Sequence, residues 1–148
     1  MKIKDITLAI NKCLAKNLDK SVVFYVDKVP KDFARPSVFI KFVRIKTERK
    51  SITQLEKEMN FTVTYYGTVD EYYNTKKLGL YDVLDSIMDA FGVEILDVGG
   101  RYISIKSSFG GEDDGEIYVD LKVVFQADVK NNIIDKEKYE KMEKLYLN

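Results

Sequence analysis

The residues best suited to chemistry lie in one short acidic stretch, GGEDDGE, at residues 110–116. It contains four carboxylates: Glu112, Asp113, Asp114 and Glu116. Carboxylate oxygens are the ligands that hard divalent cations prefer, and a bound cation can activate water for hydrolysis. A metal-dependent site is therefore one interpretation of this stretch, and the hydrated turn of a β-hairpin is the other.

Histidine is absent from the chain, and cysteine occurs once, at Cys13. Without an imidazole, serine and cysteine hydrolase triads lack their general base, and zinc sites built from Cys and His ligands are excluded. A single cysteine also excludes an internal disulfide and is typical of a reducing compartment. An enzyme with this sequence would have to use carboxylate, lysine or tyrosine chemistry.

The spacing of the acidic residues does not match a calcium loop, which needs carboxylates at alternating positions, a central glycine and a distant bidentate glutamate. A two-metal site needs acids from separate strands. Asp120 could join Asp114 and Glu116, but no lysine motif or second acidic strand accompanies them. Glycines on both sides of the acids favour a flexible turn between two strands, whose charges discourage edge-to-edge pairing. We therefore predict a hairpin turn that serves as a contact element, with no catalytic residue, cofactor or metal.

The elements that position this turn follow from two hydrophobic periods, 3.6 residues for helices and two for strands. The predicted elements are a helix at 2–18, strands at 21–26, 37–49 and 57–68, a helix at 69–92 capped by Gly92, short strands around Gly99–Gly100, a strand from Ile117, and a charged helix at 135–148. This order, α-β-β-β-α-β-β-β-α, predicts an α+β fold with a largely antiparallel sheet, two main helices packed on one face and a short C-terminal helix.

Residues 37–49 carry apolar side chains on both faces, which predicts a central strand that is covered on both sides. Cys13 lies on the apolar stripe of the first helix, so we predict a buried side chain rather than a reactive thiol. The length of 148 residues fits one α+β domain at 1–134 with a helical extension at 135–148. Neither a signal peptide nor a membrane span is predicted, and we expect a cytoplasmic protein.

The net charge is zero, but the charges are unevenly distributed along the chain. Residues 1–50 carry 13 basic and 5 acidic side chains, a balance of +8, and residues 82–120 carry 2 basic and 10 acidic, a balance of −8. Two oppositely charged regions suit head-to-tail association, because complementary potentials steer and align partners. A total of zero argues against general nucleic-acid binding.

The order of the predicted elements and the sequence pattern resemble a known family over nearly the whole chain. The segments that carry the resemblance are VFYVDKVPKDFARPSVFIKFV, FTVTYYGT, LYDVLDSIMDAF and RYISIKSSFGGEDDGEIYVDLKVVFQ. They are similar to the small tail terminator, or tail completion, proteins of tailed bacteriophages, with relatives in prophages and phage-tail-like bacteriocins. The resemblance implies an α+β subunit of a ring, commonly a hexamer. Such a ring caps the tail tube, stops its polymerisation and joins the head, without catalytic residues.

The implied partners are other copies of the chain, the tail tube protein, and the sheath or head connector, in a virion or tail-like particle. Three segments are expected to protrude and form contacts: the proline loop 27–36, the basic strand end and turn 44–54, and the acidic turn 109–116. The candidate contact residues are Lys28, Lys31, Arg35, Arg44, Lys46, Arg49, Lys50, Phe109, Glu112, Asp113, Asp114 and Glu116. The four cations from Arg44 to Lys50 are expected to face the lumen or tube, and the acidic turn to contact a neighbour or the tube.

Alternative functions remain open from the sequence. A nucleic-acid-binding module could use the basic first third with Tyr65, Tyr66, Tyr72 and Tyr73 as stacking platforms. A carboxylate enzyme could hold a divalent metal at Asp114, Glu116 and Asp120. Within the structural class, a different connector or a tail-tube protein of similar size is also compatible with this chain.

Overall fold

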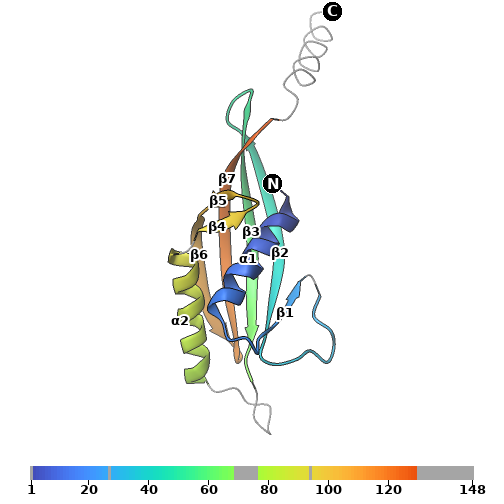
Figure 1. The fold of residues 1–148 in the computed structure, drawn as a ribbon, viewed down its shortest axis with the longest axis vertical. Helices are drawn as coiled ribbons and strands as arrows, with labels where there is room; N and C mark the ends of the chain where they lie inside the picture. Colours follow the sequence, from blue (N-terminus) through green and yellow to red (C-terminus); the bar gives the residue numbers. More distant parts are fainter. Residues whose placement is uncertain (1, 27, 69–76, 94, 130–148) are drawn as a thin grey trace, which may run out of the picture.

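The computed structural model describes residues 2–26, 28–68, 77–93 and 95–129. These residues form an elongated α+β structure dominated by a sheet (Figure 1). The prediction of an α+β fold with two main helices is confirmed. The predicted helix at 135–148 lies outside the described residues.

The first helix, α1, spans Ile3–Asn17. Its apolar residues recur at helical spacing, and Ile6, Ile10 and Leu14 are fully buried, as the period of 3.6 predicts. The helix begins after Lys2, whose backbone N–H donates to the Asp5 carboxylate at 2.9 Å and so satisfies one donor of the first turn.

Cys13 is buried on the same stripe of α1, as the sequence predicts. The second helix, α2, spans Lys77–Val93. The prediction that Gly92 caps this helix in a left-handed conformation is wrong, because α2 continues one residue further and Gly92 has no positive φ.

The main sheet has five strands in the order β1-β2-β3-β7-β6. The strands span Val23–Val26 (β1), Ser37–Arg49 (β2), Gln54–Tyr66 (β3), Ile105–Asp113 (β6) and Glu116–Asp128 (β7). β1 pairs in parallel with β2, and every other pair is antiparallel, so the prediction of a largely antiparallel sheet is confirmed. β3 and β7, far apart in sequence, pair along their whole lengths at the centre.

A separate two-stranded hairpin is formed by β4 (Leu96–Val98) and β5 (Arg101–Ile103). Gly99 and Gly100 have φ of 60° and 87° and form its turn, which confirms the hairpin predicted there. Four strands therefore follow α2, where the sequence predicted three. The missed boundary is Ser104, the single residue between β5 and β6, which carries no turn signal.

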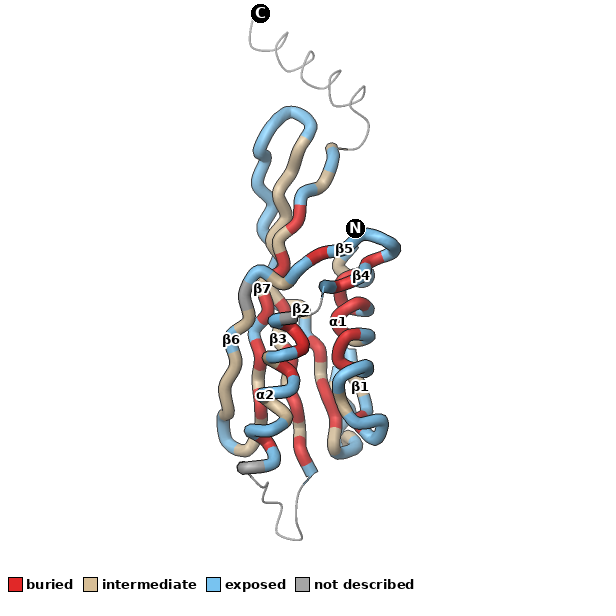
Figure 2. The backbone as a smooth tube through the Cα atoms, turned by 60° about the vertical axis from the view of Figure 1, so that its left-hand side comes forward, coloured by how far each residue is buried: buried red, intermediate tan, exposed pale blue. Residues whose placement is uncertain are grey.

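The core lies on one face of the sheet. On β7 the residues Ile117, Val119 and Leu121 are buried, and Val119 lies in one row with the buried Val63 of β3 and Ile40 of β2. Both helices and the β4–β5 hairpin pack against this face, which we call the core face (Figure 2). Apolar side chains alternate with polar ones along each strand because successive side chains point to opposite faces.

We call the opposite face of the sheet the open face. The prediction that residues 37–49 are covered on both sides is wrong, because no described helix lies on this face. Phe39 on this face is half-buried, and Val43, at a register shift between Phe42 and Arg44, is 50% exposed. The described helices all lie on the core face, so apolar residues on both sides of a strand here do not mark a second covering layer. None of the helices within the described ranges is long and apolar enough to span a membrane.

Candidate assembly interface

The acidic stretch is the turn of the β6–β7 hairpin, as predicted. Asp113 and Glu116 face each other in register, and the turn consists of Asp114 and Gly115, with φ of 50° and 81°. These left-handed values suit Asp and Gly, which tolerate them better than other residues. The Glu112 carboxylate accepts a hydrogen bond from the Gly115 N–H at 3.0 Å, which holds this side chain to its own turn. The two exposed acids at the tip are Asp113 and Asp114.

The structure does not bring these acids together with Asp120. Asp120 lies on β7 four residues beyond Glu116, a separation of about 13 Å along an extended strand. Its carboxylate accepts a hydrogen bond from the Thr62 hydroxyl at 2.8 Å, so it is engaged within the sheet. Within the part of the chain that the structure describes, no group of three acidic, His or Cys side chains has the arrangement of a metal site.

Arg35, at the end of the proline loop, is held by the body of the protein. Its guanidinium carbon lies 5.0 Å from the centre of the Phe33 ring and 5.8 Å from the centre of the Tyr66 ring. One of its N–H groups donates to the Gly67 carbonyl at 3.1 Å, and the two rings are 4.7 Å apart. We call Phe33, Arg35, Tyr66 and Gly67 the Arg35 cluster. It anchors the loop through Arg35, while Lys28 and Lys31 of that loop are exposed.

Electrostatics connect the Arg35 cluster to the acidic turn. The pKa of Tyr66 is raised, mainly because burial disfavours the phenolate and also because Glu116 is nearby, while Arg35 acts in the opposite direction. Ser37, Tyr66 and Glu116 occupy one row across the sheet, which explains this proximity. The proline loop and the acidic turn therefore lie towards the same end of the sheet.

They lie along opposite edges of that end. The loop follows β1, the edge strand on one side, and the turn joins β7 to β6, the edge strand on the other (Figure 1). Phe109, on β6, is 68% exposed and shares a row with Asp120, which places it on the open face. One edge thus presents Lys28 and Lys31, and the other presents acids and an exposed aromatic ring.

The basic strand end forms a protruding β2–β3 hairpin at the other end of the sheet (Figures 1 and 2). Its turn is exposed, and Ile52 there is 73% exposed. The Lys50 ammonium lies 3.4 Å from the Glu48 carboxylate and 3.7 Å from the Glu56 carboxylate. Arg49 donates to the Ile52 carbonyl at 3.0 Å.

The cations of this hairpin do not form an uninterrupted basic patch. Arg44 pairs in register with Asn60 and Lys46 with Glu58, so polar and acidic residues of β3 lie beside the basic side chains of β2. The positive balance of the first 50 residues is a property of the sequence segment, and cross-strand pairing partly neutralises it in space.

The tyrosine pair at 65–66 does not form a stacking platform. Tyr65 points to the core face and is 8% exposed, and its pKa is raised mainly by burial and secondarily by Asp19. Tyr66 points to the open face, where it packs against Phe33. Tyr72 and Tyr73 lie outside the described residues.

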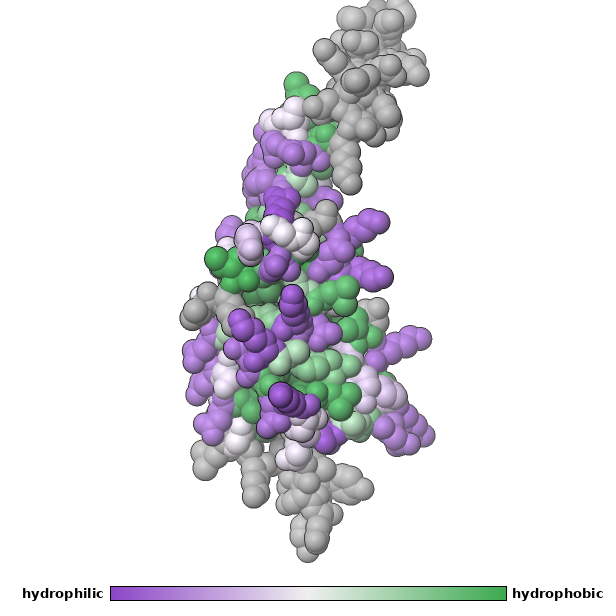
Figure 3. Space-filling model, viewed as in Figure 1, coloured by the Kyte–Doolittle hydropathy of each residue, from purple (hydrophilic) through white to green (hydrophobic). Residues whose placement is uncertain are grey.

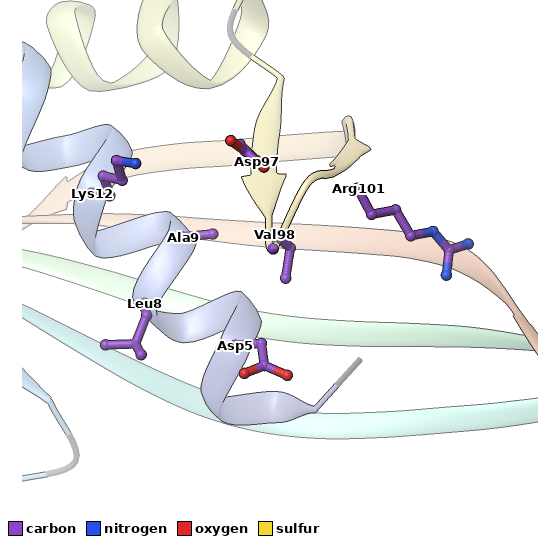
Figure 4. A pocket seen from close by; sticks show the side chains of 8 residues that line it. Asp5, Leu8, Ala9, Lys12, Asp97, Val98 and Arg101 are labelled. Atoms are coloured by element: carbon purple, nitrogen blue, oxygen red, sulfur yellow. The ribbon is translucent and has the colours of Figure 1, made fainter.

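The sequence interpretation missed a hollow of about 560 Å³ between α1 and the β4–β5 turn, which we call the α1 groove. Its lining is Asp5, Leu8, Ala9, Lys12, Asp97, Val98, Gly99 and Arg101 (Figure 4). Leu8 is 52% exposed although it belongs to a helix whose other leucine is buried. Figure 3 shows hydrophobic surface between hydrophilic groups on the face that carries α1. The sequence offered one indication of this groove, because Leu8 is an apolar residue of α1 that lies outside its buried stripe.

Comparison with known proteins identifies a family and similar solved structures. A family model described as "Phage tail terminator protein" matches residues 5–139. Among solved structures, a similar chain is the PVC sheath/tube terminator of an extracellular contractile injection system, determined by cryo-EM in the extended state. The two chains are 12% identical with a TM-score of 0.59, and the match covers 88% of this chain and 58% of that chain. At this identity the likeness shows a shared fold, and no curated protein matches the chain.

Proposed function

The chain belongs to the phage tail terminator family, whose role in tail assembly is structural, and from this premise we propose that copies of it assemble head to tail into a ring that ends the tail tube. The ring, which we expect to be a hexamer, meets the tube on one side. Its other side is available to the sheath or the head connector. Assembly takes place in the cytoplasm, and the ring remains in the virion or tail-like particle.

The observation that carries this proposal is the placement of unlike charges on opposite edges of one end of the sheet. Exposed Lys28 and Lys31 lie along the β1 edge, and exposed Asp113 and Asp114 lie at the β6–β7 turn. A contact between two different surfaces of identical subunits propagates by rotation and closes into a ring if the rotation permits. We assign these four side chains to the contact between neighbouring subunits.

Phe109 supports the same contact. Phe109 is 68% exposed on the edge strand β6, so its side chain buries apolar area if a neighbouring subunit covers it. Aromatic residues are enriched in the centres of interfaces. The charges around it then align the neighbours and increase the association rate.

We assign the protruding β2–β3 hairpin to the tail tube. It lies at the opposite end of the sheet from the charged edges, so it remains available when the ring has closed. Its exposed side chains are both apolar and basic: Ile52 lies at the turn, and Arg44 and Lys46 lie along the strand. A mixed surface of this type suits a transient docking step that becomes stable once many subunits bind together.

Charge exchange tests the ring contact. The variant K28E/K31E is expected to abolish rings in negative-stain images, and D113K/D114N is expected to do the same. Mixed in equal amounts, the two variants recover mixed rings only if these residues face one another. The control K2E/K4E changes the net charge by the same amount as K28E/K31E at the exposed start of α1 and is expected to leave assembly intact. Intact rings in both edge variants would contradict the assignment.

A subunit can also remain monomeric until it meets its target, so the same variants are tested on purified tail tubes. Wild-type protein is expected to bind tube ends, and the edge variants are expected to bind them weakly and singly. The variant R44E/K46E keeps both edges and is expected to form rings that no longer bind the tube. Tube binding by R44E/K46E at wild-type level would contradict the role of the hairpin.

A further inference from the structure

The main sheet has two outer edges, one along β1 and one along β6 (Figure 1). Because these are the terminal strands, the outward backbone groups of each have no strand partner within the described chain. Unpaired edge strands of this kind are templates for pairing with another chain. Whether the two edges fit one another depends on their rows in the sheet and on the direction of their backbone groups.

On β1, the outward backbone groups belong to Phe24 and Val26. The Val23 N–H donates to the Pro36 carbonyl at 3.1 Å, so the backbone groups of Val23 point into the sheet. Successive residues of a strand direct these groups to alternate sides, so those of Phe24 and Val26 point outward. Within the described residues, the Lys28 N–H donates to the Val26 carbonyl at 2.9 Å, and this oxygen keeps a second lone pair.

On β6, the outward backbone groups belong to Glu112 and Gly110. Both residues of the β6–β7 turn have positive φ, and a turn of this kind joins the carbonyl of its first residue, Asp113, to the N–H of its last, Glu116. The backbone groups of Asp113 therefore point towards β7. By the same alternation, those of Glu112 and Gly110 point away from the sheet.

The outward groups of the two edges lie in the same rows of the sheet. One row runs from Phe24 on β1 to Glu112 on β6. The row two residues along runs from Val26 to Gly110. The strand direction reverses three times between the edges, so β1 and β6 are antiparallel. In a ring whose axis runs along the strands, rotation keeps these rows level and brings the two edges of neighbouring subunits together.

We propose that β1 of one subunit pairs with β6 of the next, with Phe24 opposite Glu112 and Val26 opposite Gly110. The N–H of each residue then donates to the carbonyl of the residue opposite it, as in successive hydrogen-bonded pairs of an antiparallel ladder. This inference rests on the ring proposed above and gives its contact a backbone register. The sheets of neighbouring subunits join into one sheet that continues around the ring.

The side chains at this junction fit the pairing. Val26 shares a row with the buried Ile40 and so lies on the core face, where it is 39% exposed. Opposite it, Gly110 has no side chain, and Leu84 and Met88 of α2 approach its backbone. The pairing therefore brings the exposed Val26 against apolar atoms of the neighbour.

The same pairing keeps the proline loop near the neighbour's acidic turn. The loop ends at Ser37, which shares a row with Asp113 at the start of that turn. The charged side chains of the loop and of the turn thus belong to the same contact as the paired strands.

Proline at position 26 tests the backbone hydrogen bonds. V26P removes an N–H that points outward, and proline is tolerated at such positions of an edge strand. The monomer is expected to keep its urea midpoint, while rings and capped tube ends require at least about a tenfold higher protein concentration, because a hydrogen bond is lost at every contact. V26T keeps the N–H at the same position and is expected to assemble as the wild type does.

Cysteine pairs in the full-length chain with C13A test the register. Val23 and Asp113 share the next row, so V23C of one subunit faces D113C of its neighbour within disulfide range. Within one subunit these positions lie at opposite edges of the sheet, about 19 Å apart, so a disulfide joins two subunits. Oxidation of rings is expected to give a ladder of covalent oligomers on a non-reducing gel. The matched pair V23C with F109C lies about 13 Å out of register and is expected to cross-link at least about tenfold more slowly.

The outcomes separate this pairing from the ring itself. V26P rings that form at the wild-type concentration, or faster cross-linking through F109C than through D113C, would overturn the pairing while the ring remains. Covalent dimers of the single variant D113C, formed as fast as the V23C/D113C oligomers, would mean that two β6 edges pair with each other and would also overturn it. If the wild type neither forms rings nor caps tube ends, the ring proposal fails and the pairing fails with it.

Discussion

Replacement of Arg35 by alanine tests whether this residue stabilises the fold or belongs to the assembly contact. The sequence placed Arg35 among the contact cations, yet the structure engages its guanidinium with two aromatic rings and the Gly67 carbonyl. If the Arg35 cluster is structural, the R35A variant loses stability as a monomer. If Arg35 acts mainly between subunits, R35A folds as the wild type does and loses only assembly.

The expected size follows from the contacts. A hydrogen bond from a charged donor contributes about 1.5–3 kcal/mol, and this one belongs at or below the lower limit because Arg35 is exposed. Each cation–π contact at an exposed site adds about 0.5–1 kcal/mol. In R35A, water can hydrogen-bond to the Gly67 carbonyl in place of Arg35 and so recovers part of the lost interaction energy. We therefore expect R35A to lower the free energy of unfolding by about 1–2 kcal/mol. For a chain of this length that corresponds to a decrease in Tm of about 3–8 °C.

Urea unfolding of the monomer, followed by circular dichroism, measures this loss. The midpoint is expected to fall while the m value stays the same, because the surface exposed on unfolding hardly changes. R35K keeps the charge but loses the planar guanidinium, and we expect it to lose about half as much stability. Y66F, which keeps the ring, serves as a control for the stacking partner.

An unchanged midpoint in R35A would refute the reasoning, because it would mean that the cluster adds nothing to the monomer. If R35A at the same time failed to form rings, Arg35 would return to the contact residues beside Lys28 and Lys31. Loss of stability with normal rings at low temperature would confirm the structural role.

Three further predictions concern the fold. L121A removes a side chain that is 1% exposed at the centre of the core and is expected to cost about 2–5 kcal/mol, measured by urea unfolding. D114V forces a β-branched residue into a φ of 50° and is expected to cost about 1–2 kcal/mol, whereas D114G is expected to be nearly neutral; equal losses in both would argue against the observed turn. Tyr65 and Tyr66 have raised pKa values in the folded state, so they hold their protons more tightly when folded. Stability is therefore expected to be full below pH of about 10 and to fall as the pH rises through their folded pKa values, and Y65F and Y66F should flatten this decline in pH-dependent unfolding.

Much of the secondary structure could be read from local patterns. The period of 3.6 located α1, and alternation located β3 and β7, because burial of one face imposes its spacing on the residues. The turns at Gly99–Gly100 and at the acidic stretch were also predictable, since left-handed backbone favours Gly and Asp. These features depend on neighbours along the chain, which a single sequence contains in full.

The arrangement of the contact residues could not be read in this way. Pairing of β3 with β7 across a helix and a second hairpin sends the acidic turn to one end of the sheet and the basic hairpin to the other. The pairing of β2 with β3 brings Glu56 and Glu58 beside the cations of β2, so a basic stretch of sequence becomes a mixed surface. Parallel pairing of β1 with β2 places the proline loop along the edge opposite the turn. The pairing of β3 with β7 follows from contacts between residues far apart in sequence, whose register is set by the shared core, and no local period encodes that these two strands meet.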